Sequence, residues 1–219
     1  EGEEEPDLLT PQVPLILDFF EAAGIAIVGM DDYEADDVIA TFATREKGPI
    51  RIATGDRDLF QLVDEKRDVK VAYLAKGISN HDLVNHSWIE KKYEIPGERY
   101  ALFAMIRGDA SDGLPGIKGI GEKGAAEIAK NYSSMADLIE AAKAEDSKLS
   151  QNHRKKILAD LDYASVADRL VQCARDVNLP EIDLSIPNSA KNAKYLETMK
   201  SDYGLGASVD RLLSAFNWS

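Results

Sequence analysis

The apolar residues in the first part of the chain recur with the periods of helices and strands. Residues 11–23 place their apolar side chains on roughly one face of a helix, and Gly24 supplies a C-terminal stop. The short apolar run at residues 25–28 is typical of a buried strand. A second helix is predicted over residues 33–44, with acidic residues in its first turn, where the helix macrodipole favours them.

Strands are predicted again over residues 49–53 and 69–74, where β-branched and apolar residues gather. Short connections between strand, helix and strand are typical of a parallel α/β arrangement. Two further helices are predicted over residues 87–93 and 97–106. We therefore expect an α/β fold with a mostly parallel central sheet flanked by helices.

The pattern changes after Gly108, where glycine-rich sequence gives way to helical periods. The elements predicted after it are helices as far as about residue 175, an extended segment over 176–190, and two last helices near 190–200 and 207–216. We therefore divide the chain into an α/β core over residues 1–107 and a helical region over residues 108–219.

Composition narrows the class of protein without deciding its partner. The chain has 219 residues and one cysteine, Cys173, which excludes an internal disulfide framework and fits a reducing cytoplasm. No apolar run approaches the about 18 residues of a membrane span, so we expect no membrane partner. The net charge of −13 argues against nucleic acid, but basic residues gather locally at Lys118, Lys123, Lys130 and residues 153–156.

Carboxylates gather in three segments, two of which follow predicted strands. The candidate residues are Glu34, Asp36, Asp37, Asp56, Asp58, Asp109 and Asp112. The carboxyl ends of parallel strands meet at one sheet edge, so we expect a shared site. Oxygen ligands without neighbouring His or Cys suit Mg²⁺ or Mn²⁺, and two such ions about 4 Å apart support phosphodiester hydrolysis. The alternative is three ordinary helix caps and turns.

A glycine-rich stretch over residues 113–126 precedes an amphipathic helix. Glycines let backbone amides at a helix N-terminus approach a phosphate, and lysines add positive charge. The candidate DNA-binding residues are Gly116, Lys118, Gly119, Gly121 and Lys123. The alternative is a tight turn between two helices that binds nothing.

Three linked motifs resemble those of the 5′-nuclease superfamily. They are Tyr-Glu-Ala-Asp-Asp at 33–37, Thr-Gly-Asp-Arg-Asp at 54–58, and the Gly-Asp-Ala-Ser-Asp-Gly-Leu-Pro-Gly-Ile-Lys-Gly-Ile-Gly-Glu-Lys-Gly-Ala stretch at 108–125. Their order and spacing are similar to those of the bacterial flap endonuclease, or 5′→3′ exonuclease domain, related to that of DNA polymerase I. The resemblance covers the chain from about Leu8 to its end.

The resemblance implies roles for these residues. The seven carboxylates become catalytic metal ligands, with Asp36 nearest the first ion. The glycine-rich stretch becomes a helix–three-turn–helix motif, similar to a helix-hairpin-helix, whose carbonyl oxygens at Leu114, Ile117 and Ile120 hold a K⁺ against duplex phosphates. The implied partner is DNA with a 5′ flap, a nick or a single-strand junction, and an attached or separate DNA polymerase is a further one. We expect a monomer in the bacterial cytoplasm, associated with the nucleoid.

The sequence also departs from the superfamily. Gly113 stands where relatives commonly carry Asn. The superfamily's first strand, with its metal-binding Asp, and its helical arch are missing, so we expect an upstream portion. The expected activity is 5′→3′ exonuclease and flap endonuclease action in replication and repair. Two alternatives stay open: a catalytically impaired branched-DNA-binding protein of the same fold, and an acidic Mg²⁺-dependent phosphohydrolase acting on small molecules.

Overall fold

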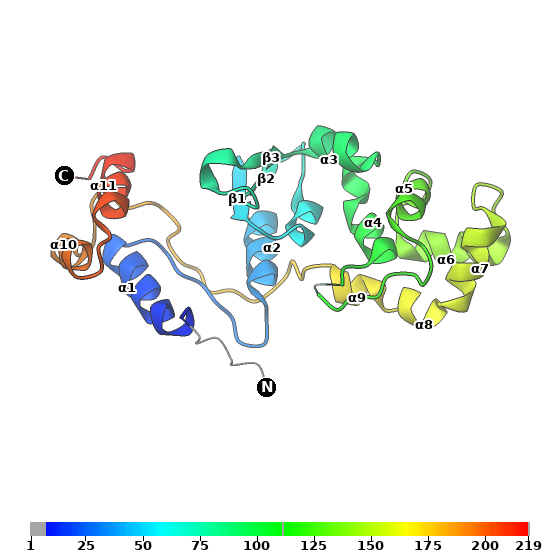
Figure 1. Cartoon of the computed structure of the whole chain (residues 1–219), viewed down its shortest axis with the longest axis horizontal. Helices are drawn as coiled ribbons and strands as arrows, with labels where there is room; N and C mark the ends of the chain where they lie inside the picture. The colour runs from blue at the N-terminus through cyan, green and yellow to red at the C-terminus, as the bar shows by residue number, and fades with distance from the viewer. Residues whose placement is uncertain (1–7, 111, 219) are drawn as a thin grey trace. The chain divides into compact units, whose positions relative to one another are not determined.

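The computed structural model describes residues 8–110 and 112–218, which form two compact units (Figure 1). One unit consists of residues 33–177. The other combines the described residues up to Asp32 with those from Asn178 onward. Among the described residues, no helix has the length and apolar character of a membrane span.

A three-stranded sheet lies in the 33–177 unit. Its strands are β1 (Ile50–Thr54), β2 (Val69–Tyr73) and β3 (Asp82–Val84), in the order β1-β2-β3. β1 pairs parallel with β2 and β2 pairs antiparallel with β3, so the described sheet is mixed rather than mostly parallel. The α/β class is confirmed. β3 has only three residues, too few to give a period that predicts it.

Residues 25–28, predicted as a strand, are not a strand in the structure. An apolar run becomes a strand only when a neighbouring backbone completes its hydrogen bonds. No ladder with this segment is formed among the described residues. The prediction was therefore wrong, because a short apolar run does not specify its pairing partner.

Helices make up most of the 33–177 unit. They are α2 (Ala35–Arg45), α3 (His86–Tyr93), α4 (Tyr100–Arg107), α5 (Glu122–Ala129), α6 (Met135–Ala144), α7 (Gln151–Ala159), α8 (Leu161–Ala164) and α9 (Ala167–Val171), with 3-10 turns η2 (Asp58–Leu62), η3 (Ile78–Asn80) and η4 (Gly97–Arg99). The helices expected over 33–44, 87–93 and 97–106 are confirmed within a few residues.

An aromatic cluster anchors η2, the turn that follows β1. The Phe60 ring lies edge-on to the rings of Tyr73 on β2 and Trp88 on α3, with centroids 5.0 and 5.5 Å apart. It also packs against Tyr100 on α4, at 5.2 Å. Such ring pairs contribute about 0.5–1.5 kcal/mol each beyond area burial. The backbone around Asp56 and Asp58 is therefore tied to the core.

One hydrophobic core runs from α2 and β1 through α4 to α9. The expected boundary between residues 107 and 108 falls inside this core, at the end of α4. The compact unit 33–177 contains both sides of it. The division of the chain into domains at residues 107 and 108 stays a prediction.

The second unit is a small helical cluster. It contains η1 (Thr10–Gln12), α1 (Val13–Ala23), α10 (Ala193–Asp202) and α11 (Gly206–Ala215). Its core joins Ala22, Leu196 and Val209. The Asn192 N–H donates to the Ala22 carbonyl at 2.8 Å, which connects the start of α10 to the end of α1. The two last helices and the extended segment before them agree with the sequence prediction.

Candidate active site

The first acidic group sits at the start of α2. Glu34 has extended backbone angles as the N-cap, and its N–H donates to Asp37 Oδ2 at 3.2 Å. Asp36 and Asp37 occupy the first turn, where the positive end of the helix dipole stabilises negative charge. Asp37 Oδ1 accepts a second hydrogen bond, from the Ala174 N–H at 2.7 Å.

The second group follows the carboxyl end of β1. Two local hydrogen bonds shape this turn: Asp56 N–H donates to Thr54 Oγ1, and Asp58 N–H donates to Asp56 Oδ1, both at 2.9 Å. Side-chain-to-backbone bonds of this kind are why Asp and Thr favour turns. They fix the backbone of the turn that carries Asp56 and Asp58, and they orient the Asp56 carboxylate.

The third group lies between α4 and the glycine-rich hairpin. Asp109 and Leu114 form a β-bridge, with N–H to carbonyl distances of 3.0 and 2.9 Å. Gly108 has φ +73°, and a Cβ there would lie 2.5 Å from the Gly116 nitrogen. Only glycine allows this backbone approach. The approach folds the chain back so that Asp112 joins the other acids.

Asp109 differs from the other acids because it is paired with arginines. Its Oδ2 accepts hydrogen bonds from Arg57 Nη2 at 2.9 Å and Arg107 Nη2 at 3.2 Å. The side chains of Asp109 and Arg107 are only 13% and 11% exposed, whereas Arg57 is 42% exposed. One role of Asp109 in the structure is therefore to balance these two cations.

The three groups interact electrostatically. Burial raises the pKa of Asp58 to about 6, with further contributions from Asp56, Asp112, Asp109 and Asp36. Burial also raises the pKa of Asp36, helped by Asp56, Glu34, Asp37 and Asp112. The other candidate carboxylates thus interact with Asp36, with Asp58 or with both. Like charges that raise one another's pKa favour an added cation.

The donor set fits a hard divalent cation, because it consists of carboxylate oxygens. In the part of the chain that the structure describes, no group of three or more His, Cys, Asp or Glu side chains is arranged to hold a metal ion. The seven acids are therefore electrostatic neighbours that do not form a closed coordination shell.

Sequence reasoning missed a segment that covers the acidic site. Burial raises the pKa of the Cys173 thiol to about 12, and Asp36, Asp37 and Asp58 raise it further, so this side chain lies beside the carboxylates. The Cys173 N–H donates to Gln61 Oε1 at 3.1 Å. Gln61 is the one uncharged polar residue of η2 and lies among the apolar residues Leu59, Phe60 and Leu62, and that exception to the apolar pattern was the available signal.

The hairpin presents its candidate residues unequally. Lys118, Gly119, Gly121 and Lys123 are exposed, whereas Gly116 is buried. A Cβ at Gly116 would lie 2.6 Å from the Arg107 carbonyl oxygen. Gly116 therefore serves the close packing of the hairpin on α4 and is poorly placed for a phosphate.

Helix α7 and the residue that caps it contact the hairpin. The Lys118 N–H donates to Asp160 Oδ2, and Lys156 Nζ donates to the Gly119 carbonyl, both at 2.7 Å. Of the carbonyls expected to hold K⁺, that of Leu114 accepts from Asp109 N–H and that of Ile117 accepts from Ile120 N–H. A carbonyl oxygen has a second lone pair, so these bonds leave room for a further ligand.

Family models match both halves of the chain. Residues 2–94 match the model described as 5'-3' exonuclease, N-terminal resolvase-like domain, and residues 95–194 match 5'-3' exonuclease, C-terminal SAM fold. Together with the acidic site, they define the class: a nuclease with an α/β core followed by a helical region.

Similar proteins carry names from the same class. A 5'-3' exonuclease of Streptomyces coelicolor is 44% identical over 98% of this chain and 71% of its own length. One from Mycobacterium tuberculosis is 38% identical over 98% and 70%. A DNA polymerase I of Mycobacterium bovis is 34% identical over 94% of this chain but 23% of its own length. This chain therefore belongs to the 5'-3' exonuclease family.

Solved structures share the fold at low sequence identity. The T5 D15 protein co-crystallised with metal ions matches with a TM-score of 0.60 and 17% identity, over 99% of this chain and 73% of its own. The catalytic core of Rad2 in complex with DNA substrate matches with a TM-score of 0.56 and 17% identity, over 96% and 71%. At this identity the likeness concerns the fold alone.

Proposed function

We propose that this chain is a divalent-metal-dependent, structure-specific 5′-nuclease acting on DNA flaps, nicks and primer ends in replication and repair. One observation carries the proposal: burial, together with repulsion from the other candidate carboxylates, raises the pKa values of Asp36 and Asp58. The relatives named 5'-3' exonuclease support the reaction. The T5 D15 protein co-crystallised with metal ions and the Rad2 core in complex with DNA substrate support the cofactor and the partner.

The seven carboxylates would hold Mg²⁺ or Mn²⁺. Glu34, Asp36 and Asp37 form the first group, with Asp36 nearest one ion, and Asp56 is shared between groups. The second group consists of Asp58, Asp109 and Asp112. When bound, such ions activate water and stabilise the leaving oxygen of a phosphodiester. The chain's own contribution is to hold these oxygens on elements anchored in the core, with Phe60 anchoring η2.

The hairpin would bind the DNA duplex through its phosphates. Lys118 and Lys123 are exposed there, and phosphate contacts position a protein on DNA without reading bases. Carbonyls of Leu114, Ile117 and Ile120 would hold a K⁺ beside the same phosphates. Gly119 and Gly121 are exposed where the backbone can approach the duplex. Recognition would therefore depend on the shape of the junction.

The relatives also suggest a setting for this activity. Because DNA polymerase I of Mycobacterium bovis matches over part of its length, we propose that the chain works beside a DNA polymerase. Its site would be the bacterial nucleoid, and it would act as a monomer.

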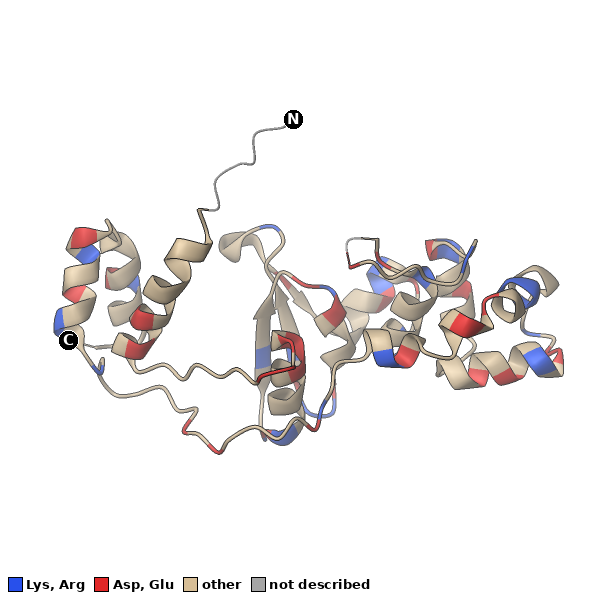
Figure 2. Cartoon of the chain, turned by 90° about the horizontal axis from the view of Figure 1, so that it is seen from below, with Lys and Arg blue, Asp and Glu red and all other residues tan. Residues whose placement is uncertain are grey.

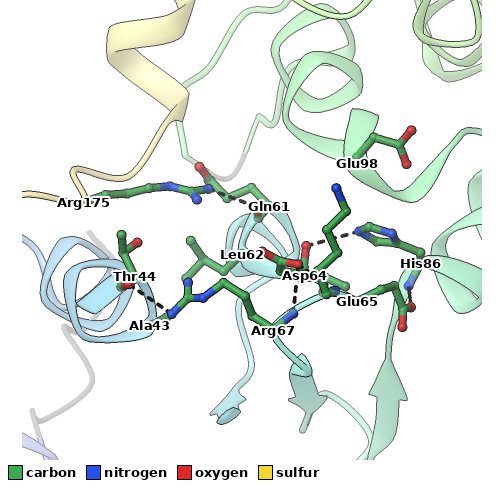
Figure 3. A pocket seen from close by; sticks show the side chains of 12 residues that line it. Ala43, Thr44, Gln61, Leu62, Asp64, Glu65, Arg67, His86, Glu98 and Arg175 are labelled. Atoms are coloured by element: carbon green, nitrogen blue, oxygen red, sulfur yellow. Dashed lines mark hydrogen bonds between the residues drawn. The ribbon is translucent and has the colours of Figure 1, made fainter. Parts of the chain in front are cut away.

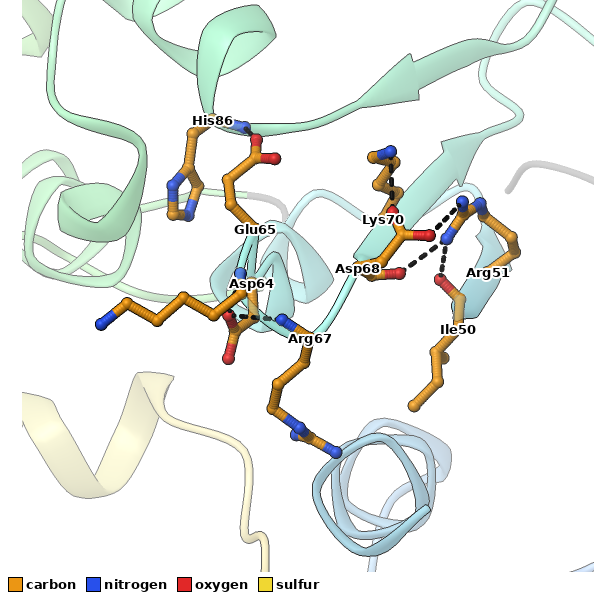
Figure 4. A network of polar contacts seen from close by, with 9 residues as sticks. Ile50, Arg51, Asp64, Glu65, Arg67, Asp68, Lys70 and His86 are labelled. Atoms are coloured by element: carbon orange, nitrogen blue, oxygen red, sulfur yellow. Dashed lines mark hydrogen bonds and ion pairs between the residues drawn. The ribbon is translucent and has the colours of Figure 1, made fainter. Parts of the chain in front are cut away.

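The decisive experiment replaces single carboxylates and measures Mn²⁺-dependent cleavage of a 5′-flap duplex. Asp36→Asn and Asp56→Asn should abolish cleavage and leave duplex binding in EDTA intact. The matched control is Asp68→Asn: Asp68 pairs with Arg51 and Lys70 at 2.9 and 2.8 Å (Figure 4). Its cleavage should equal that of the parent chain.

Full cleavage by Asp36→Asn would contradict the proposed metal site. An inactive chain that binds duplex would point to the DNA-binding alternative, and hydrolysis without duplex binding to a phosphohydrolase.

A further inference from the structure

Residues 171–177 form a strap that leaves α9 and crosses to α2 (Figure 1). Three hydrogen bonds join this strap to Gln61 of η2, and three join it to α2. Here the chain returns from helices α5–α9 to α2 and η2, the elements that carry Asp36, Asp37 and Asp58. These residues are separated by more than a hundred positions in the sequence, so no local pattern predicts the contact.

Gln61 connects the strap to η2. Its Nε2 donates to the Asp58 carbonyl at 2.9 Å and to the Val171 carbonyl at 3.0 Å. Its Oε1 accepts from the Cys173 N–H at 3.1 Å. Arg175 Nη2 also donates to the Gln61 carbonyl at 3.1 Å (Figure 3). The side-chain amide of Gln61 therefore uses its NH₂ group and its oxygen to join the strap to η2.

Thr41 and Asp37 connect the strap to α2. The Ala174 N–H donates to Asp37 Oδ1 at 2.7 Å, and the Ala174 carbonyl accepts from Thr41 Oγ1 at 3.4 Å. Thr41 Oγ1 also accepts from the Val177 N–H at 3.2 Å. Thr41 is 3% exposed and is the one buried polar residue among the described residues. Its hydroxyl bonds only to the strap.

We infer that the strap positions the carboxylates of α2 and η2 relative to each other, and that Gln61 and Thr41 are positioning residues for the metal site. The inference rests on the proposed function. Carboxylates that repel one another separate unless their elements are held together. Gln61 and Thr41 hold the strap as neutral groups, so neither of them adds a counter-charge beside the acids. Through them the strap places the Ala174 N–H on Asp37 Oδ1, and outer-shell partners that orient a ligand in this way are worth about 10–100-fold in metal affinity or activity.

The test measures Mn²⁺ affinity of the whole chain by electron paramagnetic resonance titration, with cleavage of a flap duplex as a second readout. Gln61→Met removes the three amide hydrogen bonds and keeps the length of the side chain. Gln172→Met is the matched control: Gln172 lies in the same strap, but its side chain is exposed and its amide donates to Asp168 Oδ1 on α9, at 2.8 Å, instead of to η2 or α2. Thr41→Val removes the hydroxyl from α2, and Thr41→Ser keeps it.

Gln61→Met and Thr41→Val should weaken Mn²⁺ binding by about 10–100-fold and raise the Mn²⁺ needed for cleavage. Duplex binding in EDTA and the circular dichroism spectrum should be unchanged, which a purely structural role does not predict. Thr41→Ser and Gln172→Met should bind Mn²⁺ like the parent chain. If Gln61→Met does not fold, the Thr41 pair decides.

Parent-like Mn²⁺ affinity in folded Gln61→Met and Thr41→Val would overturn the inference. Loss of folding in both variants would also overturn it, because the strap would then serve the fold alone. Asp36→Asn and Asp56→Asn distinguish failure of the metal site from failure of the positioning role. If they bind Mn²⁺ normally, the proposed metal site is wrong. If they lose Mn²⁺ while the strap variants keep it, only the positioning role is wrong.

Discussion

Single residues in the site have structural partners as well as proposed catalytic roles. Asp109 is the sharpest case, because its Oδ2 is shared by Arg57 and Arg107 in a largely buried position. Asp37 similarly accepts from the Glu34 and Ala174 amides. Variants at these positions therefore report on stability and on function, and the two effects need separate measurements.

Arg107→Met should destabilise the chain by about 1–3 kcal/mol, because it leaves part of the buried Asp109 charge without a partner. The measurement is urea unfolding followed by circular dichroism. Lys76→Met is the control. Lys76 forms an ion pair with Asp82 at 3.1 Å on the surface, and surface ion pairs contribute about 0–1 kcal/mol to stability. Equal losses in the two variants would contradict a special role for the Arg107 pair.

The raised pKa of Asp58 predicts how stability depends on pH without metal. Folded Asp58 has a pKa of about 6, above its ordinary value of 3.8, so the folded state binds its proton more tightly than the unfolded state. Its contribution to stability is therefore greatest below about pH 4 and is lost as pH rises to about 6. In EDTA, the difference in urea midpoint between Asp58→Asn and the parent chain should grow in favour of the variant across this range. A constant difference would show that Asp58 titrates normally.

At the scale of elements, the site depends on how short segments are anchored. Phe60 ties η2 to β2 and α3, and the start of α2 is held by Asp37 and the strap. The hairpin is anchored to α4 through the backbone approach of Gly108 and Gly116 and through Ile117 N–H, which donates to the Ile106 carbonyl at 2.9 Å. Each anchor joins a polar loop to the common core.

Gly108→Ala should disrupt the hairpin more than Gly113→Ala. Both glycines have positive φ, which costs an L-residue about 1–2 kcal/mol. Only at Gly108 would the new methyl group meet backbone, at 2.5 Å, whereas nothing lies within 4 Å of Gly113. The additional cost should be about 1–3 kcal/mol, with weaker duplex binding. Thermal melts and fluorescence anisotropy measure both, and equal costs at the two positions would contradict the close packing.

At the scale of the whole molecule, a chain of net charge −13 binds a polyanion only through local arrangement. Over helices α5–α7, at the right of Figure 2, basic and acidic residues are interspersed. Some of these charges are paired, as Arg154 with Glu145 at 2.9 Å. The exposed hairpin lysines, Lys118 and Lys123, should therefore contribute more to duplex affinity than their small number suggests.

Lys118→Gln and Lys123→Gln should each weaken duplex binding and lower the slope of log affinity against log salt by about 1. Lys47→Gln removes the same charge from the exposed connection between α2 and β1 and should leave the slope unchanged. Fluorescence anisotropy of a flapped duplex, titrated in KCl and in NaCl, measures both effects. Tighter binding in KCl would support the carbonyl K⁺ site, and identical curves would contradict it.

Local sequence patterns were enough to predict the α/β class, most of the helices, β1 and β2. Helical periods and the turn chemistry of Thr54, Asp56 and Asp58 depend on neighbouring residues, and these local predictions agree with the structure. The seven candidate carboxylates came from their motifs, and their role as metal ligands stays a prediction. The periods do not specify pairing, which is why residues 25–28 were assigned a strand they do not form and why β3 was missed.

Only the tertiary structure decided which distant groups meet. The arginine pairing of Asp109 joins residues 52 positions apart, and the Ala174 amide reaches Asp37 across 137 positions. Such contacts depend on how the chain returns through the core, and the sequence near either residue carries no record of it. The sequence by itself therefore determined which acids are present and on which elements they sit. The fold decided which of them are paired, which repel one another and which segment holds them together.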